Sequence, residues 1–114
     1  MLFRSLSYGA HAGSAAPLRE GKGTSWEGGT RVPCILSWPG HIPAGTLSDT
    51  LLMTIDILPS LAHITQAPLP ERKIDGLNAW PLFAGTDTAH PHDAYFVYYG
   101  RNELQAVQIG RAHV

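Results

Sequence analysis

The residues with the clearest chemical potential lie in one stretch, residues 17–33, which reads PLREGKGTSWEGGTRVP. Lys22 stands between two glycines, and Glu27, a Gly-Gly pair and Arg31 follow it. Glycine removes side-chain bulk, so the backbone can approach a ligand closely and adopt positive φ. A lysine in such a loop is a compact cation that can reach an oxyanion. The stretch predicts either an anion-contacting lysine or a solvated lysine on a glycine-rich loop.

A nucleotide-binding alternative fails on the residues around this lysine. Gly21-Lys22 is similar to the end of a phosphate-binding P-loop. That motif needs glycine at the position of Ala16 and Ser or Thr at the position of Gly23. Neither condition is met, so ATP binding is not expected.

Other polar side chains are weaker candidates. His11 lies upstream of the lysine and could line a substrate pocket, or it could be an exposed loop histidine. His90 and His92 form an H-x-H pair, but no nearby Cys, Asp and His complete a tetrahedral set, so a plain connector is expected. Cys34 lies in an apolar run and is predicted to be a buried, inert thiol. No metal ligand is predicted.

Composition predicts a folded domain with neither nucleic acid nor a membrane as partner. The 114 residues are 44% hydrophobic and 15% charged, which is enough apolar surface for a core. The net charge of −1 gives no attraction to polyanions. The longest apolar run, residues 51–61, is interrupted by Thr54, Asp56 and Pro59, so no membrane-spanning helix is expected. A single cysteine excludes an intramolecular disulfide.

The elements that must position the lysine follow from local patterns. Residues 5–29 lack apolar periodicity and predict a long irregular loop. Residues 31–38, RVPCILSW, predict a buried strand that ends at a Pro-Gly pair. Apolar residues then recur at steps of three or four, which predicts a helix capped by Asp56, with Pro59 in its first turn, fading by residues 66–68.

The C-terminal third predicts a small antiparallel sheet. A short apolar segment, residues 77–83, is followed by a polar connector, residues 86–93. Residues 94–99, AYFVYY, have the aromatic and β-branched content of a strand, and strand packing explains these aromatic side chains more simply than a binding face does. Residues 104–109 are the expected hairpin partner.

Several blocks, in a fixed order, carry a family resemblance over residues 7–107. They read GKGTSWEGGTRVPCILSWPGHIPAG, SDTLLMTIDILPSLAHI and IDGLNAWPLFAG. This order and content resemble the sulfatase family of the alkaline-phosphatase-like superfamily, nearest to arylsulfatase A-type enzymes. The resemblance implies an α/β fold: a fragment of the sulfatase fold with a central-sheet strand and helix, followed by the start of a small antiparallel C-terminal sheet. It places residues 1–85 in the catalytic domain and 86–108 in a C-terminal subdomain.

The resemblance also implies a chemistry. Lys22 matches the family's active-site lysine, which contacts the sulfate of the substrate, a sulfate ester. Glu27, Gly28, Gly29 and Arg31 match the same motif, and we expect them to be structural, with the two charged residues paired. Such enzymes are sulfuric ester hydrolases, usually periplasmic, secreted or lysosomal.

Intact family members also use a formylglycine and calcium, and we expect this chain to hold neither. The formylglycine derives from a cysteine in a C-x-P-x-R context, whereas Cys34 is followed by ILSW. The Asp-Asn pair that helps to hold calcium has no counterpart in residues 1–5, MLFRS. The chain alone is therefore predicted to be inactive. Residues 1–6 and the tail 109–114, IGRAHV, are expected to be non-native, the tail because it resembles a translated sequencing adapter.

Two other functions stay open at this point. The chain could be a non-catalytic module that binds sulfated glycans through Lys22, or belong to a phosphatase or phosphodiesterase of the same superfamily. The EGG-x-R-V-P block favours the sulfatase branch. Glycan binding that is lost in Lys22→Ala would favour the module, and upstream coding sequence with C-x-P-x-R would favour the hydrolase.

Overall fold

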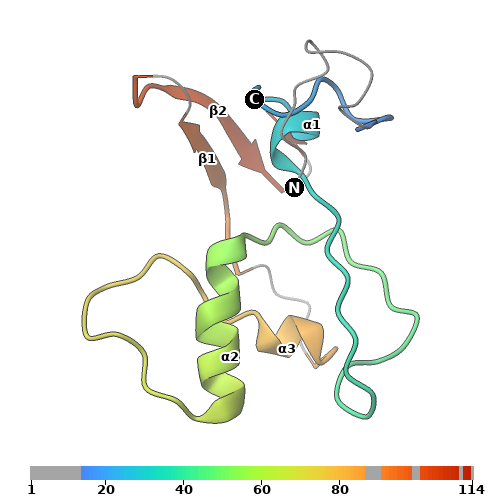
Figure 1. The fold of residues 1–114 in the computed structure, drawn as a ribbon, viewed down its shortest axis with the longest axis vertical. Coiled ribbons are helices and arrows are strands. Elements are labelled where there is room, and N and C mark those ends of the chain that lie inside the picture. The colour runs from blue at the N-terminus through green and yellow to red at the C-terminus, as the bar shows by residue number, and fades with distance from the viewer. Residues whose placement is uncertain (1–13, 87–90, 99–100, 111, 114) are drawn as a thin grey trace. The chain divides into compact units, whose positions relative to one another are not determined.

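A computed structural model describes residues 14–86, 91–98, 101–110 and 112–113 (Figure 1). They fall into two compact units: residues 1–34 with 94–114, and residues 35–93. We call these unit 1 and unit 2 and describe each by itself. The units divide the chain at other positions than the predicted boundary after residue 85, which refers to an intact enzyme and stays a prediction.

Unit 1 contains an antiparallel sheet with strand order β1-β2-β3. The strands are β1 (Tyr95–Tyr98), β2 (Leu104–Ile109) and β3 (Ala112–His113). Val97 pairs with Ala106 across β1 and β2, and both side chains are buried. The hairpin predicted from the sequence is confirmed. Two of its aromatic side chains, Phe96 and Tyr98, do not belong to the core, because they are 53% and 60% exposed.

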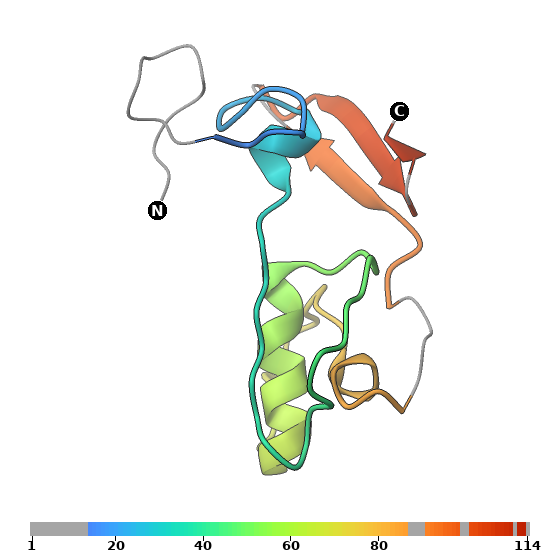
Figure 2. The ribbon, with the colours of Figure 1, turned by 90° about the vertical axis from the view of Figure 1, so that its right-hand side faces the viewer.

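A short helix, α1 (Glu27–Thr30), stands where the sequence predicted only irregular loop. Its single turn is closed by the Arg31 amide, which donates to the Glu27 carbonyl at 2.8 Å. Two central glycines are poor helix formers, so propensity gave no signal for this turn. Figure 1 shows α1 beside the end of β2, and a side chain of β2, Gln108, donates a hydrogen bond to Glu27 of α1; Figure 2 shows the hairpin and α1 from the side.

The prediction of a buried strand over residues 31–38 is wrong. The segment belongs to no strand, and all eight positions are exposed, Ile35 to 92%. A strand needs a neighbour for its amides and carbonyls, and the only strand ladders in the described residues are those of β1, β2 and β3. Cys34 is exposed for the same reason, so the predicted buried thiol is also wrong.

Unit 2 is built on helix α2 (Ile57–Thr65), which follows a 3-10 turn, η2 (Thr54–Asp56). The helix ends at Gln66, whose φ of 56° is the left-handed conformation of a helix C-cap. These bounds confirm the predicted helix, with Pro59 in its first turn. A second short helix, α3 (Trp80–Phe83), packs against α2.

The buried face of α2 consists of small residues, only one of which is polar. Pro59, Ser60 and Ala62 are buried, whereas Leu58 and Leu61 are 53% and 54% exposed. Ala79, just before α3, is only 2% exposed. Small residues allow close approach of α2 and the chain around α3, so the core of unit 2 depends on hydrogen bonds as well as apolar contacts. No helix in the described residues is long and apolar enough to cross a membrane.

Candidate functional site

Lys22 lies on a tight turn in unit 1, in a segment that we call the lysine loop, residues 19–29. The side chain of Lys22 is half-buried, and the preceding Gly21 is buried. The Thr24 hydroxyl donates to the Gly21 carbonyl at 2.9 Å and closes the turn around the lysine. Gly23 has a φ of 91°, which favours glycine because a Cβ there would clash. The turn therefore fixes the backbone that carries Lys22.

The two glycines of α1 bring its backbone against this turn. The Gly28 amide donates to the Arg19 carbonyl at 2.9 Å. A Cβ at Gly28 would meet the carbonyl oxygens of Arg19 and Glu20, the former at 2.5 Å. A Cβ at Gly29 would meet the Gly21 carbonyl oxygen at 2.7 Å. Only glycine permits this packing, so α1 and the lysine turn form one backbone unit.

Charged side chains lie on both sides of this unit. Glu27 Oε2 and Arg31 Nη1 are 3.8 Å apart, with side chains 26% and 54% exposed. An ion pair this exposed contributes little stability. The Arg19 guanidinium lies 3.7 Å from the centre of the Trp26 ring, within the range of a cation–π contact. The lysine loop therefore carries two cations, Arg19 and Lys22, and a third, Arg31, follows it directly after α1.

Strand β2 contacts the lysine loop through two glutamines that the sequence analysis did not identify. The Ser25 hydroxyl donates to Gln105 Oε1 at 2.7 Å. Gln108 Nε2 lies 3.4 Å from Glu27 Oε1 and donates to it. The partners are about eighty residues apart in sequence. No local pattern could have predicted these pairs, because only the hairpin brings them together.

Of the candidate histidines, the structure describes only His92. His11 and His90 lie outside the described residues. His92 belongs to unit 2, where its side chain is only 9% exposed and its Nε2 lies 2.7 Å from Asp56 Oδ1. The described residues around His92 are irregular, as predicted for a connector, but the sequence did not indicate that this side chain is buried and bonded. Its buried position is set by a carboxylate far away in sequence.

Asp56 is the centre of a buried hydrogen-bonded group. Its side chain is 1% exposed. The carboxylate accepts bonds from the Met53 amide at 2.8 Å and the Leu77 amide at 2.9 Å, besides the contact with His92. Asp56 occupies the N-cap position of α2, but its side chain makes no capping bond to that helix. The predicted capping role is thus corrected: the carboxylate holds three separate segments of unit 2.

Ser60 extends this group by one helical turn. Its hydroxyl donates to the Asp56 carbonyl at 2.7 Å and accepts from the Ala79 amide at 2.9 Å. We call the side chains of Asp56, Ser60 and His92, with the amides that they bind, the Asp56 cluster. Because Ser60 donates to a backbone carbonyl and not to the histidine, the three side chains do not form a nucleophile relay.

The described residues do not gather several carboxylates at one place, which is the common arrangement of calcium ligands. Among them, no group of three or more His, Cys, Asp or Glu side chains could hold a metal ion. The buried Asp56 carboxylate is already occupied by donors. We therefore assign no described residue to calcium and derive no chemical step through it.

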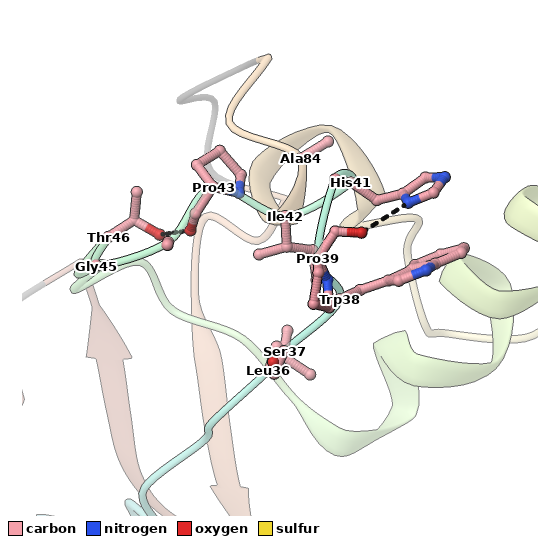
Figure 3. Close-up of a pocket in the computed structure, with 12 residues that line it drawn as sticks. Leu36, Ser37, Trp38, Pro39, His41, Ile42, Pro43, Gly45, Thr46 and Ala84 are labelled. Carbon is pink, nitrogen blue, oxygen red and sulfur yellow. Dashed lines mark hydrogen bonds between the residues drawn. The ribbon is translucent and has the colours of Figure 1, made fainter.

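A cavity of about 830 Å³ lies in unit 2, lined by residues 36–46 and Ala84. Figure 3 shows the Trp38 and His41 rings close together at its edge, where they stack with centroids 4.1 Å apart. The lining contains no acidic residue, lysine or arginine. It includes none of the predicted site residues, so it supplies no charge with which to bind a sulfate group.

Comparison with known proteins identifies the relatives of this chain. Residues 21–113 match the family described as N-sulphoglucosamine sulphohydrolase, C-terminal. The chain is 42% identical to Arylsulfatase A of Homo sapiens over 89 residues, 78% of this chain and 17% of that protein. It is 39% identical to Arylsulfatase A of Bos taurus over 98 residues, 86% of this chain and 19% of that protein.

A third relative has a different named substrate. Steryl-sulfatase of Homo sapiens is 44% identical over 89 residues, 77% of this chain and 15% of that protein. The chain thus spans 15–19% of the length of these relatives. The match over most of this chain confirms the resemblance seen in the sequence. The chain belongs to the sulfatase family and corresponds to its C-terminal region.

Proposed function

We propose that this chain supplies part of the active site of a sulfuric ester hydrolase, in which Lys22 contacts the sulfate group of the substrate. The observation that carries the proposal is a lysine on a turn closed by Thr24 and backed by the glycines of α1. A cation held by a fixed backbone can stabilise developing negative charge with little reorganisation. The named relatives, which are sulfatases, support the same reaction class.

The reaction requires stabilisation of negative charge during bond cleavage. Hydrolysis breaks the bond between sulfur and the ester oxygen, and the oxygen of water ends on sulfate. The ester oxygen leaves with a proton as an alcohol. The Lys22 ammonium would contact the sulfate oxygens and lower the energy of the transition state by Coulombic attraction. Glu27, Gly28, Gly29 and Arg31 would hold the backbone beneath it.

The nucleophile would come from residues outside these 114. The single cysteine, Cys34, is followed by ILSW and so does not have the C-x-P-x-R context. We therefore propose that the 114-residue chain alone does not hydrolyse sulfate esters. In the intact family, a formylglycine supplies the attacking group, and the part of the chain described here binds and orients the sulfate.

A graft tests the role of Lys22. The segment of this chain that aligns with bovine arylsulfatase A would replace the matching 98 residues of that enzyme. In the active graft, Lys22→Ala should lower kcat/KM for an aryl sulfate by about 100- to 1,000-fold, the typical loss of an oxyanion-stabilising group. Lys73→Ala is the matched control, because Lys73 is the other lysine of the chain and is exposed in unit 2. Equal kinetics for the two variants would refute the proposal.

A further inference from the structure

We infer that Gln105 and Gln108 of β2 are positioning residues that hold the lysine loop at a fixed place against the sheet. This inference rests on the proposed function for the part that concerns catalysis. The contacts themselves involve only unit 1. Neither glutamine touches the substrate in this proposal, because each acts through a loop residue.

The two contacts attach the loop on the C-terminal side of the lysine. Ser25 follows Lys22 by three positions, and its hydroxyl donates to Gln105 Oε1 at 2.7 Å. Glu27 follows by five positions, and its Oε1 accepts from Gln108 Nε2 at 3.4 Å. Glu27 Oε2 faces Arg31 instead, at 3.8 Å. The two oxygens of Glu27 thus join β2 and the end of α1.

β2 is a suitable support because it is the central strand of the sheet. Gln108 is opposite Tyr95 of β1 and His113 of β3, so ladders on both sides fix its backbone. Ala106, between the glutamines, is buried. The ladders therefore fix the backbone from which the Gln108 side chain starts. Gln105 lies at the register shift between β1 and β2, with ladder-paired residues on both sides of it.

Displacement of Ser25 or Glu27 would reach Lys22 through two hydrogen bonds of neighbouring residues, one from a side chain and one from the backbone. Thr24, the neighbour of Ser25, bonds to the Gly21 carbonyl. Gly28, the neighbour of Glu27, donates to the Arg19 carbonyl. These two bonds close the chain on both sides of Lys22. Loss of the attachment to β2 should therefore loosen the lysine turn, even though β2 is far away in sequence.

The first measurement uses the 114-residue chain and does not depend on catalysis. Gln105→Met keeps the side-chain length but removes the acceptor for Ser25. Exchange of the Gly28 amide, which donates to the Arg19 carbonyl, should become about fivefold faster, because the loop opens more often. Gln105→Glu keeps an acceptor and should restore slow exchange. Glu103→Met, at an exposed position just before β2, is the control and should leave exchange unchanged.

The second measurement uses the active arylsulfatase A graft. Misplacement of a charged group should lower kcat more than it changes KM, and we expect kcat to fall by about tenfold in Gln105→Met. In a Lys22→Ala background the same substitution should have less than about a twofold effect, since no lysine remains to be positioned. Ser25→Ala removes the donor of the same bond, so combining it with Gln105→Met should add nothing.

The outcomes separate the two proposals. Unchanged amide exchange in both Gln105→Met and Gln108→Met would overturn the positioning role. An equal loss of kcat with and without Lys22 would also overturn it, because the glutamine would then act only on stability. Faster exchange together with normal kinetics in Lys22→Ala would instead overturn the proposed role of Lys22, and would leave the attachment of the loop to β2 standing.

Discussion

The Asp56 cluster and the lysine loop each stabilise an irregular segment of the chain, but at different depths in the protein. In both, an irregular segment is fixed by hydrogen bonds between side chains and backbone. The cluster does this in the interior, where Asp56 and Ser60 are 1% and 2% exposed. The loop does it near the surface, with Lys22 half-buried and the bond from Ser25 to Gln105 exposed.

The comparison shows that buried contacts mainly determine stability, whereas contacts near the surface leave side chains accessible for function. A buried carboxylate cannot lose its donors without a large cost, so the cluster should dominate the stability of unit 2. The lysine loop obtains its rigidity from backbone contacts that only glycine allows. This arrangement leaves its charged side chains near solvent, where a sulfate ester could approach. Single substitutions should therefore cost most in the cluster and affect activity most in the loop.

The largest effect on stability is expected for Asp56→Ala. The substitution leaves two backbone amides and His92 without their acceptor in the interior, and should lower the free energy of unfolding by about 3 kcal/mol. Urea denaturation followed by the fluorescence of Trp38 and Trp80, both in unit 2, would measure it. Asp75→Ala, at an exposed position, is the control. Similar midpoints for the two variants would contradict the central role of the cluster.

Gly28→Ala should lower the free energy of unfolding less than Asp56→Ala does, but it should displace the lysine loop more. The new Cβ would collide with the carbonyl oxygens of Arg19 and Glu20, and moving α1 away should cost about 2 kcal/mol. Gly40→Ala is an informative control, since a Cβ there meets open space and only its positive φ is strained, at about 1 kcal/mol. In the graft, Gly28→Ala should reduce kcat/KM and Gly40→Ala should not. The reverse order would refute close packing of α1 on the loop.

An intermediate test within the cluster is Ser60→Ala. The Ala79 amide loses its acceptor, and the expected cost is about 1 kcal/mol. Amide exchange at Ala79 should become faster, while exchange in the hairpin of unit 1 stays the same. Ser48→Ala, at an exposed position, provides the comparison. If Ala79 exchanged at the original rate, its bond to Ser60 would not be important for the cluster.

The smallest effect is expected for the pair of Glu27 and Arg31. A double-mutant cycle with Glu27→Gln and Arg31→Ala should give a coupling energy of no more than about 0.5 kcal/mol, because solvent screens the pair. The coupling should decrease further in high salt. A coupling above about 1 kcal/mol would show that this ion pair, and not glycine packing, holds α1.

Local sequence patterns predicted the elements whose stabilising contacts are local. Helix α2 has its proline in the first turn and ends at residue 65, and nearby residues predicted both the proline's position and an end close to residue 66. The hairpin of β1 and β2 was predicted from β-branched and aromatic content on either side of a turn. The family, too, followed from the order of motifs along the chain.

The same patterns failed where a distant partner decides the conformation. Residues 31–38 have the composition of a buried strand, yet burial and pairing need neighbouring strands, and the ladders described in this chain lie elsewhere. For α1, the two glycines have low helix propensity, so the sequence did not predict a helical turn. The turn forms because its backbone packs against residues 19–21.

The sequence by itself determined the family, helix α2 and the hairpin, because each depends on motif order or on contacts between near neighbours. Tertiary structure alone decided that Asp56 binds Leu77 and His92 in place of capping its own helix. It also decided that β2 contacts the lysine loop through Gln105 and Gln108. A hydrogen bond between residues far apart in sequence produces no periodic pattern in the sequence, because its two partners come together only once the chain has folded.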